Sequence, residues 1–445
     1  MNRAGWIVVT IFLFAVFLRL GVCAAKGTLG ESPQLRYREY VVAGQRLLQH
    51  GTIVSPLIIE DVDRRPSALM PPAYVGLVAV IYGLLGVESY TATLALQLIN
   101  ALATSLAAVV AYMIAQSLAG GRAGLIAGVV AAFNPTLVGY TDFVWDTSLF
   151  TLGVAATLWM AWKLGNPPLS PLVKGGGDDP LLSPLIKGGR LWFAFSLWLG
   201  ALALLNPALT PAYPFLVLWP FARGGSWAWA RVARRAGLVI VGWVVAIAPW
   251  TIRNYAHFGE LVYVRGGFAI QLWLGVCPEA DPGGADAFKA QFPLNNPDVQ
   301  RHVAEIGERR FIRECGDRAK EAIQQDPWRF VRLCATRAVD FWAGTTFSHP
   351  DPGPGRGFAA LQRNVIAGFL LTEMGIVVLC LLLRRHVRSD VWWLLAMALA
   401  FSLIYCVTHV QLRFRAPMEP VMAVIVALLV RRHGAASLGH ATPTT

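Results

Sequence analysis

The sequence contains few charged residues: Asp, Glu, Lys and Arg make up only 14% of its 445 residues. Soluble globular domains usually carry about a quarter, so an ordinary cytosolic enzyme is excluded. The six cysteines are scattered and form no CxxC pair, which excludes a disulfide framework and gives no sign of a zinc or redox centre. Walker, GxGxxG, HExxH and GxSxG motifs are absent as well, so nucleotide binding and serine hydrolysis have no support.

Apolar residues are abundant instead. Hydrophobic residues make up 56% of the chain, and the mean hydropathy is +0.52. The 16 Trp and 22 Phe exclude a disordered chain, because so many aromatic side chains cannot all stay solvated. Apolar runs approaching the roughly 20 residues of a membrane span recur along the sequence. The composition therefore predicts an all-α polytopic membrane protein.

The apolar runs predict about ten transmembrane helices. They cover 6–23, 91–118, 123–138, 147–162, 191–205, 208–221, 236–250, 365–383, 391–407 and 417–430. Basic residues cluster between these runs, at Arg122, 163–190, 223–235, 384–388 and 431–432. All clusters fall on one side if 71–86 does not cross but lies along the outer interface. The positive-inside rule then predicts two cytoplasmic termini. It also accounts for the net charge of +12 without a nucleic-acid partner.

This topology divides the chain into three parts. Residues 1–250 form an N-terminal transmembrane module with a first outer loop (24–90) and a second outer loop (139–146). Its cytoplasmic insertion (167–190) contains a short Gly/Pro-rich repeat, Pro168–Gly176 and Leu181–Gly189, which we interpret as dispensable. Residues 251–362 form a small outer domain. It is expected to be mostly helical, because Asp326 and Pro327 suit the N-cap and first position of a helix. Residues 363–445 supply the last transmembrane helices and a cytoplasmic tail.

Acidic residues in the first outer loop are candidates for chemistry. Glu31 and Glu39 precede an expected amphipathic interfacial helix, on which Tyr40, Ala43, Leu47 and Leu48 share one face. A further acidic cluster spans 60–63. The alternative for Glu39 is a favourable acid in the first turn of a helix, and for the cluster a solvated loop.

The second outer loop places two carboxylates, Asp142 and Asp146, at the head of a predicted transmembrane helix. Polar groups at the outer membrane face are costly unless they are useful, which makes both residues candidates for chemistry. The alternatives are a structural role for Asp142 and N-capping of the next span by Asp146.

Arginines emerge at the outer ends of spans. Arg253 follows one span, and Arg413 and Arg415 precede the last one, while Arg64 and Arg65 lie in the first outer loop. The guanidinium fork suits phosphate, so converging arginines could hold a lipid phosphate. The alternative is generic contact with lipid headgroups. The histidines of the outer domain show no metal-ligand spacing; no cofactor is expected, and a divalent metal is left open.

Four motifs together resemble a known family: the proline-rich 67–74, Pro249–Tyr255, Asp326–Phe330 and Arg413–Pro417. The chain resembles bacterial glycosyltransferases of the GT-C superfamily, nearest to the protein O-mannosyltransferase and aminoarabinose transferase type, family 39. The resemblance implies a GT-C-like bundle with two juxtamembrane helices in the first outer loop. It also implies a hexosyl or pentosyl transferase of the bacterial inner membrane. Such an enzyme passes a sugar from a polyprenyl-phosphate donor to a lipid, glycan or protein acceptor on the outer face.

The resemblance also implies roles for residues. An acid of the first outer loop would be the general base, helped by the second loop, which gives Glu39, Asp142, Asp146 and Glu31 as catalytic candidates. The family usually places an aspartate three or four residues before the loop tyrosine, where this chain has Arg36 and Tyr37. The base is then Glu39, Glu31 or an acid of 60–63, or the activity is altered or lost; of these we favour Glu39. The lipid phosphate would be bound by Arg253, Arg413, Arg415, Arg64 and Arg65, and the substrate also by Tyr40 and Tyr74. The alternatives are a transporter or flippase of a lipid-linked sugar and a catalytically degenerate relative.

Overall fold

The computed structural model describes residues 3–31, 39–58, 65–165, 183–224, 228–281, 284–344, 357–384 and 386–431. These ranges are almost entirely helical and contain no strand. A single isolated bridge joins Val54 to Pro66 in the first outer loop. The predicted acidic cluster at 60–63, Arg64 and most of the predicted insertion (167–190) lie outside the described residues.

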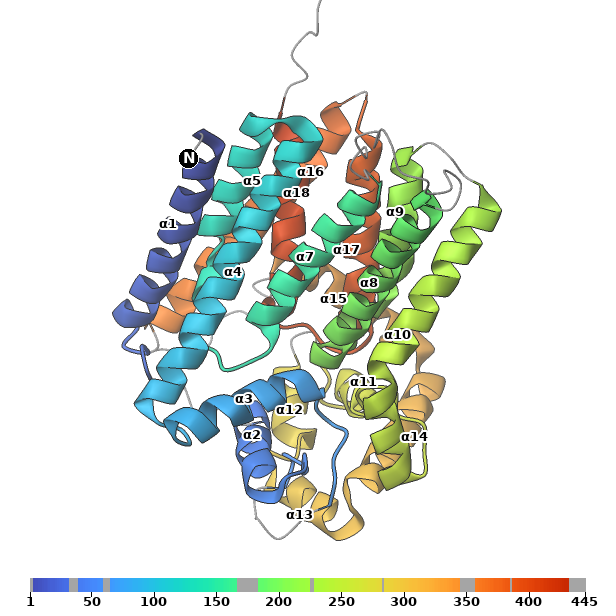
Figure 1. Cartoon of the computed structure of the whole chain (residues 1–445). Coiled ribbons are helices and arrows are strands. Elements are labelled where there is room, and N and C mark those ends of the chain that lie inside the picture. Colours follow the sequence, from blue (N-terminus) through green and yellow to red (C-terminus); the bar gives the residue numbers. More distant parts are fainter. Residues whose placement is uncertain are drawn as a thin grey trace, which may run out of the picture.

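Each of the ten predicted apolar runs lies on helix, and the all-α membrane bundle is confirmed (Figure 1). The helices are α1 (Arg3–Ala25), α4 (Tyr90–Ala119), α5 (Gly121–Phe133) with α6 (Pro135–Gly139), α7 (Thr147–Gly165), α8 (Ser183–Leu205), α9 (Tyr213–Gly224), α10 (Trp229–Phe258), α16 (Gly357–Leu383), α17 (Ser389–Val407) and α18 (Glu419–Val430). Two 3-10 segments, η1 (Pro207–Ala212) and η3 (Leu412–Met418), lead into α9 and α18. Six helices of the described chain are long and apolar enough to cross a membrane: α1, α4, α5 with α6, α10, α16 and α17.

Basic residues gather at one end of the bundle. Arg384 donates a 3.0 Å hydrogen bond to the carbonyl of Arg431, and the Arg431 guanidinium lies beside Gly120, where α4 turns into α5. At the same end, Arg223 pairs with Asp390 at 2.6 Å. Figure 1 shows this end opposite the short helices α2, α3 and α12–α14. The positions of Arg223, Arg384 and Arg431 thus agree with the prediction that the basic clusters share one side of the bundle.

The last helix, α18, is the central element of the bundle. Every residue from Glu419 to Leu429 is buried, and the helix contacts α4, α5, α7, α16 and α17. A helix that is apolar all round has to be enclosed by protein or by lipid, and here protein encloses it. Its buried Glu419 is therefore notable, because a charge in such surroundings requires partners.

The outer layer consists of two segments that are far apart in sequence. The first outer loop contributes α2 (Glu39–His50) and α3 (Pro72–Leu85), and α3 lies across the end of the bundle (Figure 1). The second contributes α11 (Phe268–Val276), α12 (Ala285–Gln291), α13 (Pro297–Ile306), α14 (Glu308–Gln325) and α15 (Pro327–Ala343). The two expected helices of the first loop and the helical outer segment are both present. As predicted, the Asp326 side chain caps α15, accepting from the Arg329 amide at 2.8 Å.

Two local details differ from the sequence-based expectations. Helix α10 continues past Pro249 to Phe258 and ends at Gly259, whose φ of +65° is the left-handed conformation that suits glycine. On α2, Tyr40 and Ala43 are buried as predicted, but Leu48 is 43% exposed. The buried face of α2 instead includes Arg46. Its guanidinium binds the carbonyls of Ser55 and Ile58 and so folds the following loop against the helix.

A buried carboxylate joins the two outer segments. Glu308, at the first position of α14, accepts hydrogen bonds of 2.9 and 2.7 Å from the hydroxyl of Ser67. Burial raises the pKa of Glu308, while hydrogen bonds from Ser55 and Ser67 act in the opposite direction. The first outer loop is thereby fixed to the outer domain directly beside the end of the bundle.

Candidate functional site

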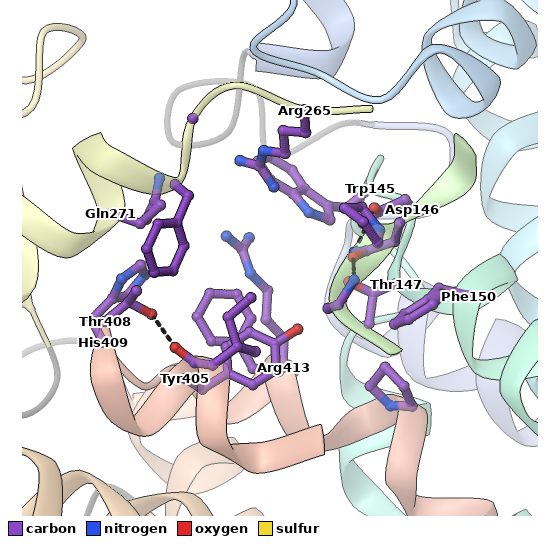
Figure 2. A pocket seen from close by; sticks show the side chains of 18 of the residues that line it. Trp145, Asp146, Thr147, Phe150, Arg265, Gln271, Tyr405, Thr408, His409 and Arg413 are labelled. Atoms are coloured by element: carbon purple, nitrogen blue, oxygen red, sulfur yellow. Dashed lines mark hydrogen bonds between the residues drawn. The ribbon is translucent and has the colours of Figure 1, made fainter. Parts of the chain in front are cut away.

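A cavity of about 180 Å³ lies between the end of the bundle and the outer layer (Figure 2). Its lining comes from α2, the start of α7 and the loop before it, η1, α11 and the loop before it, α12, the end of α17, and η3. The residues are Glu39, Trp145, Asp146, Thr147, Phe150, Asn206, Pro207, Ala208, Arg265, Gly267, Phe268, Gln271, Phe288, Ile404, Tyr405, Thr408, His409, Arg413, Phe414 and Pro417. The cavity thus collects polar side chains from segments spread over most of the sequence, within a largely aromatic wall.

Asp146 is held at the head of α7. Its Oδ2 accepts hydrogen bonds of 2.9 Å from the hydroxyl of Tyr40 and of 2.9 Å from the side-chain amide of Asn206. Its Oδ1 is buried and has no hydrogen-bond partner among the described residues. Burial raises the pKa of Asp146 to about 6, although Tyr40, Arg265 and Asn206 act in the opposite direction. The carboxylate makes no hydrogen bond to a backbone amide of α7. Asp146 therefore does not cap this helix with its side chain, which was the alternative to a chemical role.

Glu39 is the second carboxylate of the cavity and the first residue of α2. Burial raises its pKa, and Asp146 adds to this effect, while Arg265 and Arg413 lower it. Glu39 makes no side-chain hydrogen bond to a described residue and is less buried than Asp146. Both carboxylates line the cavity, and Glu39 is the more exposed of the two.

Two arginines supply positive charge to the same cavity. The guanidinium of Arg413 lies 4.3 Å from the centre of the Trp145 ring and 5.4 Å from that of Phe414. Arg265 reaches into the cavity from the loop between α10 and α11 (Figure 2). It forms no ion pair within the part of the chain that the structure describes. Both arginines lower the pKa of Glu39. The cavity therefore pairs two carboxylates with two guanidinium groups.

The other side of the cavity is neutral. Figure 2 shows Gln271, Thr408 and His409 together, across the hollow from Asp146 and Thr147. Burial, together with the nearby Arg337, Arg413 and Arg265, lowers the pKa of His409 to about 3, so its ring carries no charge at neutral pH. Asp146 thus lies on one side of the cavity and the uncharged Gln271, Thr408 and His409 on the other (Figure 2), while Arg265 and Arg413 are close enough to His409 to lower its pKa.

Two predicted site residues lie just behind this lining. Tyr40 bonds to Asp146, and its ring meets Trp145 edge-on with centroids 4.9 Å apart. Tyr74, on α3, is fully buried and meets the Tyr40 ring edge-on, also at 4.9 Å. Both tyrosines support the lining of the cavity, and Tyr40 connects it to α2.

Other predicted catalytic residues lie away from the cavity. Asp142 pairs with the Lys26 ammonium at 2.5 Å and accepts a 2.8 Å hydrogen bond from Thr28. Glu31 is exposed; its backbone amide donates to the Thr28 carbonyl, and its backbone carbonyl accepts from the Gln97 side chain. The geometry therefore gives Asp142 a structural partner and brings neither residue into the lining.

Three predicted phosphate ligands are occupied elsewhere. Arg253 donates to the Ser67 carbonyl at 2.8 Å and stacks over Trp250 at 4.6 Å. Arg415 is buried between two glutamates inside the bundle, and Arg65 donates to the Ala304 carbonyl at 3.2 Å. Of the predicted arginines that the structure describes, Arg413 alone lines the cavity.

Several lining residues had no sequence signal. Arg265, Gln271 and His409 lie in segments without a motif that predicts a site. The pairing of Asn206 with Asp146 depends on the contact between η1 and the head of α7, which no local pattern encodes. Among the described residues, no group of three or more His, Cys, Asp or Glu side chains is placed to hold a metal ion.

Comparisons with known proteins identify the fold. No protein-family profile and no curated protein sequence matches the chain. The apo oligosaccharyltransferase of Archaeoglobus fulgidus matches with a TM-score of 0.55 and 15% identity, covering 96% of this chain and 50% of that one. The same enzyme, AglB, in complex with an inhibitory peptide and a dolichol-phosphate matches with a TM-score of 0.50 at 15% identity, covering 96% and 50%. ArnT of Cupriavidus metallidurans bound to undecaprenyl phosphate matches with a TM-score of 0.43 at 15% identity, and the match covers 96% of this chain and 77% of ArnT.

The likeness to the oligosaccharyltransferase establishes the fold. The chain has the GT-C fold that the resemblance implied, and it spans about half the length of the oligosaccharyltransferase chain that it matches. With its helices long and apolar enough to cross a membrane, it is a multi-pass membrane protein.

Proposed function

We propose that the protein is a membrane glycosyltransferase that moves a sugar from a polyprenyl-phosphate donor to an acceptor on the outer face of the membrane. The observation that carries this proposal is the cavity itself, which combines Glu39 and Asp146 with Arg265 and Arg413 at the end of an apolar bundle. The cavity lies on the face opposite the basic end of the bundle, which is the outer face if the basic end is cytoplasmic. The solved neighbours support it in general terms, because one is described in complex with a dolichol-phosphate and a peptide.

The two arginines would bind the phosphate of the donor. Guanidinium groups fixed in advance stabilise negative charge that develops on a leaving group. Arg413 is held by stacking on Trp145, so little reorganisation is needed when the phosphate departs. The apolar residues of the lining, such as Phe150 and Ile404, lie on transmembrane helices and would meet the first isoprene units of the carrier.

Glu39 would be the general base. Its carboxylate takes the proton of the acceptor hydroxyl while the hydroxyl oxygen forms a bond to the anomeric carbon. The bond between that carbon and the phosphate oxygen breaks, and its electron pair leaves with the polyprenyl phosphate. Both carboxylates have a raised pKa, which suits proton transfer near neutral pH. Asp146 would act through Tyr40, by holding the start of α2 and hence Glu39 in place.

The test is a transfer assay in nanodiscs with polyprenyl-phosphate sugars as donors and a membrane extract as acceptor source. Glu39→Gln should reduce turnover about a hundredfold or more, since general bases contribute about 10²–10⁴, and it should leave donor binding intact. Glu31→Gln is the matched control, because Glu31 lies in the same outer segment but is exposed; it should retain wild-type turnover. If the wild type consumes no donor but moves it between leaflets, the transferase proposal is wrong and the protein is a flippase.

A further inference from the structure

His409 carries an unused hydrogen-bonding group on the cavity wall. The side chain is only 4% exposed, and its Nδ1 has no partner among the described residues. Its ring meets Phe288 edge-on at 4.8 Å and Phe414 at 5.2 Å. A buried polar atom without a partner costs free energy, so the position favours a ligand that supplies the missing bond.

Gln271 lines the same wall and makes no side-chain hydrogen bond within the described ranges. The amide offers two donors and an acceptor, and a neutral imidazole offers one donor and one acceptor. Together, the two side chains can both give and accept hydrogen bonds without carrying charge. This combination complements hydroxyl groups, which also donate and accept.

The two segments that carry these side chains are locked together. Arg337 is fully buried and binds the carbonyls of Gly275, on α11, and Val407, at the end of α17. Gly275 packs so closely against the residue that follows α17 that a Cβ atom on Gly275 would lie 2.2 Å from the Thr408 carbonyl oxygen. Gln271 and His409 are therefore fixed relative to each other before a ligand binds, as recognition at low entropic cost requires.

We infer that Gln271 and His409 form the recognition wall for the sugar of the donor, and that they read the hydroxyl groups of a neutral sugar ring. The inference rests on the proposed function and extends it. Arg265 and Arg413 line the same cavity as Gln271 and His409, so a phosphate bound by the two arginines places its sugar within reach of this wall (Figure 2). Phe268 and Phe288, in the same lining, supply apolar faces for the C–H groups of the ring.

The experiment compares binding of undecaprenyl phosphate with that of undecaprenyl-phosphate mannose, glucose and galactose in nanodiscs. The wild type should bind at least one sugar-carrying lipid more tightly than the bare lipid. His409→Ala and Gln271→Leu should each weaken that lipid about ten- to a hundredfold, the usual effect of a lost buried hydrogen bond, and leave undecaprenyl phosphate unchanged. His409→Asn, which keeps donor and acceptor atoms, should restore part of the loss. Arg265→Gln should weaken all four lipids.

Controls separate recognition from folding. His302→Ala alters a half-exposed histidine that pairs with Glu314 in the outer domain, and it should bind every lipid as the wild type does. Equal loss of bare and sugar-carrying lipid in His409→Ala and Gln271→Leu, or a wild type without preference for any of these sugars, would overturn the inference. If the wild type prefers a sugar-carrying lipid and this preference depends on Gln271 and His409, but no sugar is transferred, the recognition wall is supported and the transferase proposal is wrong.

Discussion

The hydroxyl of Tyr40 donates a 2.9 Å hydrogen bond to Asp146, across 106 residues of sequence. This bond joins the first outer helix to the head of a bundle helix, and Glu39 is the neighbour of Tyr40. The position of the Glu39 carboxylate thus depends on Asp146 through the hydroxyl of Tyr40.

Tyr40→Phe should lower turnover about tenfold, since a hydrogen bond to a charged group contributes about 1.5–3 kcal/mol and its loss frees the start of α2. Donor binding should change less than turnover, because the arginines are untouched. Tyr82→Phe is the matched control: Tyr82 belongs to the same apolar cluster but makes no side-chain hydrogen bond to a described residue. Equal turnover in both variants would show that the Tyr40–Asp146 bond does not position the site.

Transfer should fall below about pH 6. Burial raises the pKa of Asp146 to about 6, so Asp146 takes up a proton as the pH falls through this range. Burial also raises the pKa of Glu39, so Glu39 becomes protonated at a higher pH than an exposed glutamate does. A protonated Glu39 cannot accept the acceptor proton, and a protonated Asp146 accepts more weakly from Tyr40. The profile of kcat/KM between pH 5 and pH 8.5 should show this acidic limb.

Asp146→Asn should move that limb to lower pH. The negative charge of Asp146 contributes to the raised pKa of Glu39, and its removal leaves Arg265 and Arg413 to stabilise the ionised Glu39. The amide oxygen can still accept from Tyr40. An unchanged midpoint in this variant would mean that the two carboxylates are not coupled.

Arg413→Gln should raise the KM for the lipid donor about ten- to a hundredfold, because it removes a charge-assisted contact with the phosphate. Arg253→Gln provides the contrast. Arg253 binds the Ser67 carbonyl outside the cavity lining, so its loss should lower thermal stability and leave the KM near the wild-type value. A KM effect confined to Arg253→Gln would transfer the phosphate site to the end of α10.

Arg415→Met should be strongly destabilising. Arg415 pairs with Glu373 on α16 and, at 2.9 Å, with Glu419 on α18, and the three side chains are at most 2% exposed. Removing the cation leaves two carboxylates buried without it, a change that costs about 3–5 kcal/mol in buried pairs. Arg301→Gln, at an exposed pair with Asp298, should cost less than about 1 kcal/mol. Thermal unfolding in detergent compares the two, and similar losses would contradict a stabilising role for the buried cluster.

The apolar pattern and the basic clusters sufficed to predict the bundle. Run length marks a helix in lipid. The distribution of positive residues predicted that 71–86 lies along the interface and does not cross the membrane, and the structure has a short apolar helix there, α3. The cap at Asp326 was also predictable, because capping is a local interaction. These features depend on neighbours in sequence.

The cavity could be predicted only in part. Asp146 and Arg413 stand out as polar residues at span ends and Glu39 as an acid at the start of an interfacial helix, and the structure brings all three into the lining. Arg265 and His409 could not be identified, since their positions depend on how the outer domain packs on the bundle. Arg253 and Arg415 were expected to bind phosphate for the same reason as Arg413, but contacts distant in sequence occupy them.

The burial of α18 has a consequence for biogenesis. A chain is synthesised from its N-terminus, so the other described helices of the bundle enter the membrane before the helix that they enclose. Until Glu419 arrives, Asn134 lacks the carboxylate to which it donates a 2.5 Å hydrogen bond, and the surfaces of α4 and α5 that will cover α18 remain exposed to lipid. The bundle therefore closes only once α18 has been inserted.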